Sequence, residues 1–163
     1  MPMPAPTKKT RSQVTAKREV IYNFVASRNG YPVTTMDLVV QGIDTRDAVY
    51  QDMIWLCKNG KLQRGGGKCS YRAFYLLSSE MIFDPKYNMT RHLILKYFFE
   101  RPDQKITSSE VSEIKTGASL TRSGALKAMR PIIKDGWIIA NIDHDQNNTY
   151  YILNIEKAKQ FKR

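Results

Sequence analysis

The apolar positions in the first half of the chain predict three helices followed by a hairpin. From about residue 15 to the stop at Asn29-Gly30, and again over residues 45–58, apolar side chains recur three and four positions apart, which is the spacing of one helix face. A shorter helix should lie between these two and end at Gly42. Residues 61–77, KLQRGGGKCSYRAFYLL, then read as strand, glycine turn and strand. The apolar positions of the first two helices are Val20, Ile21, Phe24, Val25, Met36, Leu38, Val39 and Val40. In the third helix the residues expected to face inward are Val49, Met53 and Leu56, and the sequence leaves the direction of Ile54 open.

Polar residues at the helix ends supply the expected caps. Thr34 or Thr35 can cap the second helix, and Asp44 or Thr45 can cap the third, because their side-chain oxygens accept hydrogen bonds from free amides of the first turn. The third helix should close at Asn59-Gly60, with glycine just past the C-terminus.

The second half of the chain repeats the same order. Residues 89–101 predict a first helix that Pro102 stops, and Thr107 or Ser108 caps a short second helix. A final hairpin, WIIANID and TYYILN around an Asp/Asn-rich turn, completes the copy. Through the third helix the copies match with a constant shift of 76 residues, which pairs Thr45 with Thr121, Arg46 with Arg122, Val49 with Ala125, Met53 with Met129, Leu56 with Ile132, Lys58 with Lys134, Gly60 with Gly136 and Leu62 with Ile138.

The repeat sets the expected domain boundaries. Residues 1–14 should form a mobile basic arm, 15–79 a first domain, 80–88 a linker, 89–156 a second domain and 157–163 a basic tail. Pro131 falls inside the third helix of the second copy, where it removes a backbone hydrogen bond, so we expect that helix to kink or restart there.

The charge favours a polyanionic partner. The chain carries 26 Lys and Arg against 15 Asp and Glu, a formal net charge of +11, and its isoelectric point is near 9.7. Residues 1–84 hold 12 basic and 7 acidic groups and residues 85–163 hold 14 and 8, so both copies share the excess. No apolar run approaches the length that spans a bilayer, so we expect no membrane partner and a cytoplasmic protein.

Three helices and a hairpin, with the third helix ending in a glycine that leads straight into a strand, resemble the winged helix-turn-helix superfamily of prokaryotic DNA-binding proteins. The segments TRDAVYQDMIWLCKNGKL and TRSGALKAMRPIIKDGWI carry the resemblance, which covers roughly residues 15–155. It implies an α+β, mainly α, fold of two tandem winged-helix domains, each with three helices and a β-hairpin wing.

The resemblance implies that the third helices dock in the major groove of DNA. Their candidate contacts are Thr45, Arg46, Tyr50 and Gln51 in the first copy and Thr121, Arg122, Ser123 and Lys127 in the second. Arginine can read guanine and glutamine can read adenine, although each arginine can instead be an ordinary solvated residue. Asp47 and Asp52 would repel phosphates if they pointed outward, but Asp47 also suits the positive end of the helix dipole.

The glycine triplet of the first hairpin is expected to be a wing tip. Arg64, Lys68 and Arg72 surround it and can follow a phosphate backbone, or can simply keep the loop soluble. A nucleotide-binding loop is excluded because Lys68 is followed by a strand-like run and not by a helix.

The leading hypothesis is a nucleoid-associated, double-stranded DNA-binding protein that regulates transcription as a monomer or homodimer. The alternatives are a winged-helix module that binds a protein of the transcription or replication machinery, and a replication or recombination accessory factor.

Catalytic, cofactor and metal sites are not expected. His92 reads as a surface or satisfied histidine, and His144 lies in an ordinary turn. Cys57 and Cys69 lack the spacing of a zinc site or a disulfide framework. We therefore expect a binding protein and not an enzyme.

Overall fold

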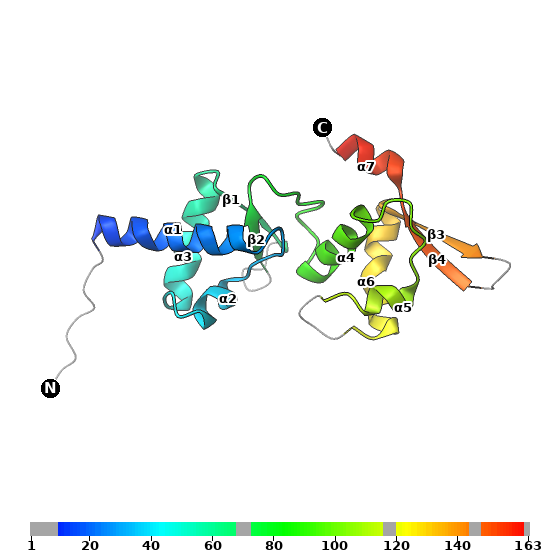
Figure 1. Cartoon of the computed structure of the whole chain (residues 1–163), viewed down its shortest axis with the longest axis horizontal. Helices are drawn as coiled ribbons and strands as arrows, with labels where there is room; N and C mark the ends of the chain where they lie inside the picture. Colours follow the sequence, from blue (N-terminus) through cyan, green and yellow to red (C-terminus); the bar gives the residue numbers. More distant parts are fainter. Residues whose placement is uncertain (1–9, 68–72, 116–119, 144–147, 162–163) are drawn as a thin grey trace. The chain divides into compact units, whose positions relative to one another are not determined.

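The computed structural model describes residues 10–67, 73–115, 120–143 and 148–161, and the chain divides into two compact units (Figure 1). The first unit comprises Met1–Arg64 and Ala73–Met81, and the second comprises Gly65–Arg72 and Ile82–Arg163. The arm expected up to residue 9, the turn at 144–147 and the end of the tail at 162–163 lie outside the described residues. Within the described ranges, no helix has the length and apolar character needed to cross a bilayer.

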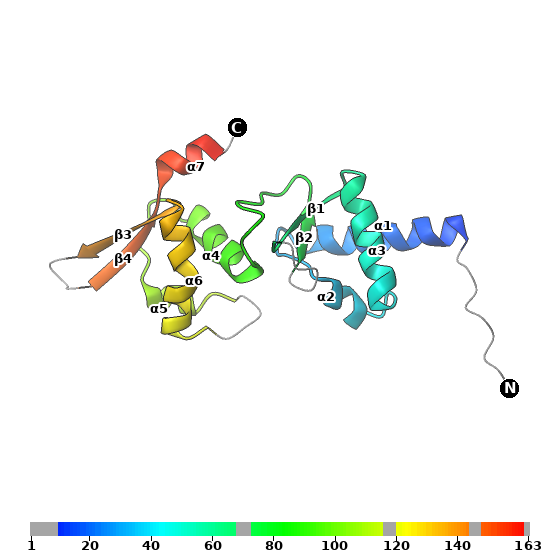
Figure 2. The same ribbon diagram turned by 180° about the vertical axis from the view of Figure 1, so that it is seen from behind.

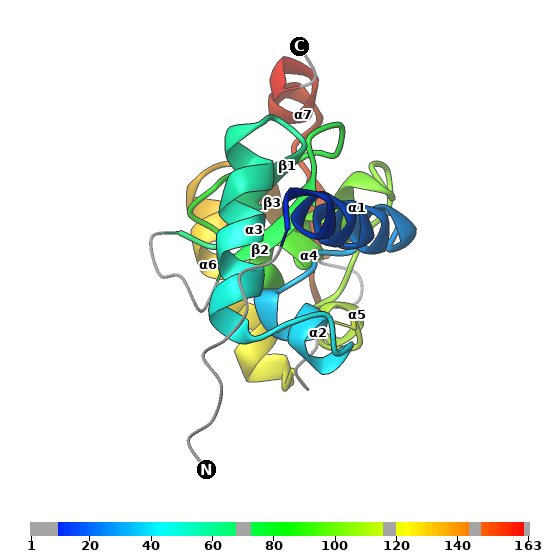
Figure 3. The ribbon, with the colours of Figure 1, turned by 90° about the vertical axis from the view of Figure 1, so that its left-hand side faces the viewer.

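The first unit has the expected order of elements. Helices α1 (Arg11–Ser27), α2 (Thr35–Val40) and α3 (Arg46–Lys58) precede a hairpin of β1 (Leu62–Gly65) and β2 (Phe74–Leu77). Figures 2 and 3 show α1 crossing α3. Thr34 and Thr45 are the N-caps of α2 and α3, which resolves the two alternatives at each start. Val33 forms an isolated bridge with Tyr75 of β2, so the hairpin has a short third partner.

The core of the first unit lies where α1, α2 and α3 meet the hairpin. Three apolar residues of α1 and α2 are exposed: Val20 (53%), Met36 (50%) and Val40 (77%). The buried stripe is narrower than the apolar pattern suggested, and the short helix α2 buries only Leu38 fully. The buried set comprises Ile21, Val25, Val33, Leu38, Val49, Met53, Leu56, Leu62, Ala73 and Tyr75.

The second unit repeats the arrangement with α4 (Met89–Phe99), α5 (Ser108–Ser112), α6 (Arg122–Lys134), β3 (Ile138–Asp143) and β4 (Asn148–Leu153). The strands pair antiparallel, with Ile138 opposite Leu153 and Ala140 opposite Tyr151. Ile106 bridges Tyr151 as Val33 bridges Tyr75, and the two tyrosines are again 76 residues apart. The fold is therefore α+β, with two tandem winged helices.

A further helix, α7 (Ile155–Phe161), occupies a segment for which the sequence predicted mainly a basic tail. Its Phe161 ring lies 5.3 Å from Trp137 and 6.1 Å from Phe83, measured between ring centroids. Phe83 in turn stacks at 4.4 Å on Phe99 of α4. Burial of these large rings against one another stabilises the helix, which has little apolar periodicity of its own.

Two helices differ from their predicted limits. Helix α1 begins at Arg11, about four residues early, because Thr10 and Gln13 form a reciprocal capping box: the Gln13 N–H donates to Thr10 Oγ1 and the Thr10 N–H donates to Gln13 Oε1. Helix α6 does not restart at Pro131 but continues to Lys134. Pro131 has no N–H to donate, but its carbonyl still accepts a hydrogen bond from the Asp135 N–H at 2.9 Å, which keeps the last turn helical.

Candidate functional site

The starts of α3 and α6 are built alike. Thr45 Oγ1 accepts from the Ala48 N–H at 3.4 Å, and Thr121 Oγ1 accepts from the Gly124 N–H at 2.9 Å. Both threonines are exposed, but their hydroxyls are already used as helix caps. Their first role is thus to start the helix, which positions the residues that follow.

The two arginines at the equivalent positions, Arg46 and Arg122, are both exposed, yet Arg122 is held by a neighbouring helix. Its Nε donates to the Oγ of Ser108, the buried first residue of α5, at 3.0 Å. The sequence predicted Ser108 only at the start of a helix and gave no indication of its contact with Arg122. The bond fixes the plane of the guanidinium at the N-terminus of α6.

The largest difference between the copies lies on the side of the third helix that faces away from the core. In each helix this side is the stripe opposite the buried residues, at i, i+4, i+7 and i+11. The outward face of α3 consists of Asp47, Gln51, Ile54 and Lys58, and the outward face of α6 consists of Ser123, Lys127, Arg130 and Lys134. The formal charge of these faces is 0 for α3 and +3 for α6.

On these faces, the sequence pattern predicts Gln51, Ser123 and Lys127 as contacts but misses Arg130 and Lys134. All four side chains of the α6 face are exposed, whereas Ile54 of the α3 face is half-buried. Extending the outward stripe past Pro131 would have found Lys134, because the helix continues there. Tyr50, also a candidate, is half-buried beside the α3 face.

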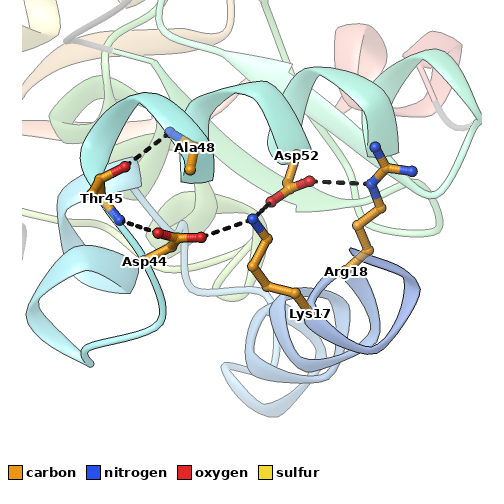
Figure 4. Close-up of polar contacts among 6 residues, drawn as sticks. All are labelled: Lys17, Arg18, Asp44, Thr45, Ala48 and Asp52. Atoms are coloured by element: carbon orange, nitrogen blue, oxygen red, sulfur yellow. Dashed lines mark hydrogen bonds and ion pairs between the residues drawn. The ribbon is translucent and has the colours of Figure 1, made fainter. Parts of the chain in front are cut away.

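Asp52 does not face outward, so the expected repulsion of phosphates by this residue does not arise. Its side chain is buried (4% exposed) and points toward α1 (Figure 4). Lys17 Nζ lies 2.6 Å from Asp52 Oδ2, and Arg18 Nε donates to Asp52 Oδ1 at 3.1 Å. Two cations thus neutralise the buried carboxylate, and α1 is tied to the middle of α3.

The same ion cluster reaches the start of α3. Lys17 Nζ also donates to Asp44 Oδ2 at 2.9 Å, and Asp44 Oδ1 accepts from the Thr45 N–H at 2.7 Å (Figure 4). Asp44 therefore does not cap α3 but supports the residue that does. The cluster fixes where α3 begins relative to α1.

The glycine wing differs from the prediction at its one described cation. Arg64 is half-buried, and its Nε and Nη2 are enclosed without a hydrogen-bond partner. Burial raises the pKa of Cys57 and of Tyr75, and the Arg64 charge beside them opposes part of that rise. Arg64 is therefore directed more into the protein than a phosphate-contacting residue should be. Lys68 and Arg72 lie outside the described residues.

The glycines of this wing adopt left-handed backbone conformations at Gly66 (φ 98°) and Gly67 (φ 78°). Within the second unit, the Gly67 N–H donates to the Pro85 carbonyl at 2.8 Å. Glycine suits these positions because other residues rarely adopt a positive φ.

His92 is buried in the second unit beside Phe83, with 5.2 Å between the ring centroids. Burial disfavours the imidazolium and lowers the pKa of His92 to about 4, and the nearby Lys96 charge adds to this. The sequence left open whether this histidine is on the surface or satisfied inside, and the buried alternative holds. Among the described residues, no group of three or more His, Cys, Asp and Glu side chains is arranged to hold a metal ion.

Comparisons with solved structures include a likeness of fold. No known protein family matches the chain, and no curated protein matches it. Its fold is similar, with a TM-score of 0.34 and 16% sequence identity, to the crystal structure of subunit VPS25 of the endosomal trafficking complex ESCRT-II. The match covers 91% of this chain and 90% of that one.

Proposed function

We propose that the protein is a non-enzymatic regulator that binds double-stranded DNA, and that the outward face of α6 makes the principal contact. The observation that supports this most is the charge of that face. Lys127, Arg130 and Lys134 lie on one exposed stripe that contains no carboxylate. Such a stripe neutralises phosphates and releases their counterions, which supplies much of the affinity for DNA.

The geometry of α6 suits the major groove. From Ser123 to Lys134 the face is about 17 Å long at a rise of about 1.5 Å per residue. The groove of B-DNA is about 12 Å wide and admits a helix. Arg122 and Ser123 then lie at the N-terminal end of α6, where winged helices place base contacts. The hydrogen bond to Ser108 orients the guanidinium of Arg122 there. The cations further along the helix contact the backbone.

Fluorescence anisotropy with a labelled duplex, at several salt concentrations, tests this proposal. We expect binding that weakens as salt rises. Removing Lys127 and Arg130 together, as K127A/R130A, should lower the slope of log affinity against log salt by about 2, because two phosphates are no longer neutralised. The matched control is Q51A/I54A on the α3 face, which changes the equivalent positions without changing charge.

Two results would contradict the proposal. One is the absence of duplex binding at low salt by protein whose folding circular dichroism confirms. The other is equal loss of affinity in the α6 and α3 double variants, which would mean that the charged stripe is not the contact.

A second function, docking on another protein, is supported by the surface of the first unit. Its α3 face is neutral, and Val20, Met36 and Val40 expose large apolar side chains on α1 and α2. Exposed apolar groups of this kind gather at protein interfaces. Affinity purification from nuclease-treated lysate separates the two functions: retention of one defined protein by the wild type and by K127A/R130A favours docking on a protein.

A further inference from the structure

A groove in the first unit lies between the N-terminal half of α1 and the C-terminal end of α3. Its volume is about 570 Å³, and Val14, Tyr22 and Trp55 supply apolar surface to it. Trp55 is 39% exposed and lines the groove. The groove is at the opposite end of α3 from Thr45, so a molecule bound in it leaves the start of the helix open.

The charged residues around this groove are mainly cations. Arg11, Arg18 and Lys61 line it, with Glu19 as the one carboxylate among its lining residues. The lining therefore carries a formal charge of +2 around an apolar floor. This combination complements a ligand that has both carboxylates and an apolar side chain.

The contact between Arg18 and Trp55 favours a peptide over a nucleic acid as the ligand of this groove. The Arg18 guanidinium carbon lies 4.0 Å above the centre of the Trp55 ring. One face of the indole is thus covered by a cation, so a base cannot stack there as it does on the open aromatic platforms that bind single strands. Because Arg18 Nε already donates to Asp52, an arginine held flat in this way offers its Nη groups to a further carboxylate in a fixed orientation.

We propose that this groove, which we name the α1/α3 groove, docks an acidic peptide segment of a partner protein and seats one aliphatic or aromatic side chain of that peptide beside Trp55. The carboxylates of the peptide pair with Arg11, Arg18 and Lys61. This site goes beyond the DNA contact proposed for α6 and does not depend on it.

The test uses the full chain and a synthetic fluorescein-labelled peptide, Glu-Glu-Leu-Phe-Glu-Leu-Glu-Glu, followed by anisotropy and by amide chemical shifts in NMR. We expect shifts confined to the lining of the α1/α3 groove. Trp55→Ala should weaken the peptide about thirtyfold, as removal of a central aromatic anchor does. Arg11→Glu, at an exposed first helical residue where folding is not at risk, should also weaken it.

Matched variants and probes make the outcome decisive. Lys127→Glu on α6 should leave peptide binding unchanged and impair duplex binding, whereas Arg11→Glu should do the reverse. The same peptide with Gln in place of each Glu should bind much more weakly, because it lacks the carboxylates.

The proposal is overturned if the Gln peptide binds as well as the Glu peptide, or if Lys127→Glu abolishes peptide binding while Arg11→Glu does not. It is also overturned if an oligonucleotide competes with the peptide and shifts the same groove residues, which would make the ligand a nucleic acid. Shifts of those residues that appear on concentrating the free chain would instead identify a second copy as the occupant.

Discussion

Helices α3 and α6 occupy the same place in the two units, yet they present different chemistry to solvent. Both begin at a capping threonine followed by arginine, and both bury an apolar stripe against their own unit. The outward face of α6 has a charge of +3, whereas that of α3 has none. The buried residues of the two helices follow the same register in both units. The exposed residues differ, and they determine what each helix can bind.

The inward sides differ in polarity at one position of the stripe. Asp52 of α3 holds Lys17 and Arg18, while the equivalent residue of α6 is Ala128, whose carbonyl accepts from Arg91 Nε at 3.0 Å. In both copies a cation of the first helix thus reaches the third helix, through a carboxylate in one unit and a backbone carbonyl in the other. The attachment is shared, but its chemistry is not.

Exchanging the outward faces should have the largest effect. The variant S123D/K127Q/R130I gives α6 the side chains of α3 and lowers its charge by three units, two of them from lost cations. We therefore expect duplex binding to become undetectable at physiological salt and the salt slope to fall by about 2. The reverse exchange in α3, D47S/Q51K/I54R, should raise affinity. Anisotropy titrations measure both, and unchanged binding by the first variant would show that the difference between the helices has no role in DNA contact.

Asp52→Ala should strongly destabilise the first unit. It leaves two partly buried cations without their shared carboxylate, and we expect the free energy of unfolding of the first unit to fall by about 3 kcal/mol. Asp47→Ala, on the exposed side of the same helix, is the control and should change it by less than about 1 kcal/mol. Urea unfolding followed by Trp55 fluorescence, with Trp137→Phe as background, measures this, and equal effects would mean that the ion cluster does not support the unit.

Acid should lower the free energy of unfolding of the second unit through His92, which has no counterpart in the first unit. The pKa of His92 is about 4 in the folded protein and about 6.5 when exposed, so the unfolded chain binds the proton first as pH falls. The free energy of unfolding of the second unit should therefore decrease by up to about 3 kcal/mol between pH 6.5 and 4. His92→Leu should remove that slope. Trp137 fluorescence with Trp55→Phe as background reports it, and a slope that persists in His92→Leu would assign the effect to another group.

Removing the N-cap threonines should give the smallest difference in stability between the two units. Thr45→Ala and Thr121→Ala each remove one hydrogen bond to a first-turn amide, at a cost of about 1 kcal/mol. We expect the cost to be larger for Thr121, whose bond is 2.9 Å long against 3.4 Å for Thr45. Replacement by Ser should restore stability in both units. The same urea experiments measure these changes, and a more destabilising effect at Thr45 would reverse the expected order.

The sequence was sufficient for the elements whose signals are local. Threonine caps, glycine stops and the 76-residue register predicted both copies of the fold, because helix ends and apolar spacing depend on neighbouring residues. Asp52 shows where this fails. Its position between Val49 and Met53 already places it on the buried side, but its partners Lys17 and Arg18 are more than thirty residues earlier, and no local pattern links them.

Other differences have similar causes. The capping box at Thr10 and the helix ending at Phe161 escape prediction because each lies beside a basic segment that resembles a tail. Arg64 was expected to be exposed because most arginines are exposed. Its side chain instead takes the direction that its place on strand β1 imposes. The α1/α3 groove depends on the crossing of two helices, and a sequence pattern carries no information about that crossing.

The paired bridges Val33 to Tyr75 and Ile106 to Tyr151 have a consequence for refolding. Each joins a short extended residue to a hairpin that comes later in the chain, and both hairpins offer a tyrosine at the same register. Each unit is therefore complete only when this short segment meets its own hairpin, which is a contact between residues far apart in the sequence and one that forms late in folding. Tyr151→Pro is therefore expected to destabilise the second unit, because proline cannot donate the amide hydrogen bond to Ile106 and the buried tyrosine ring is lost.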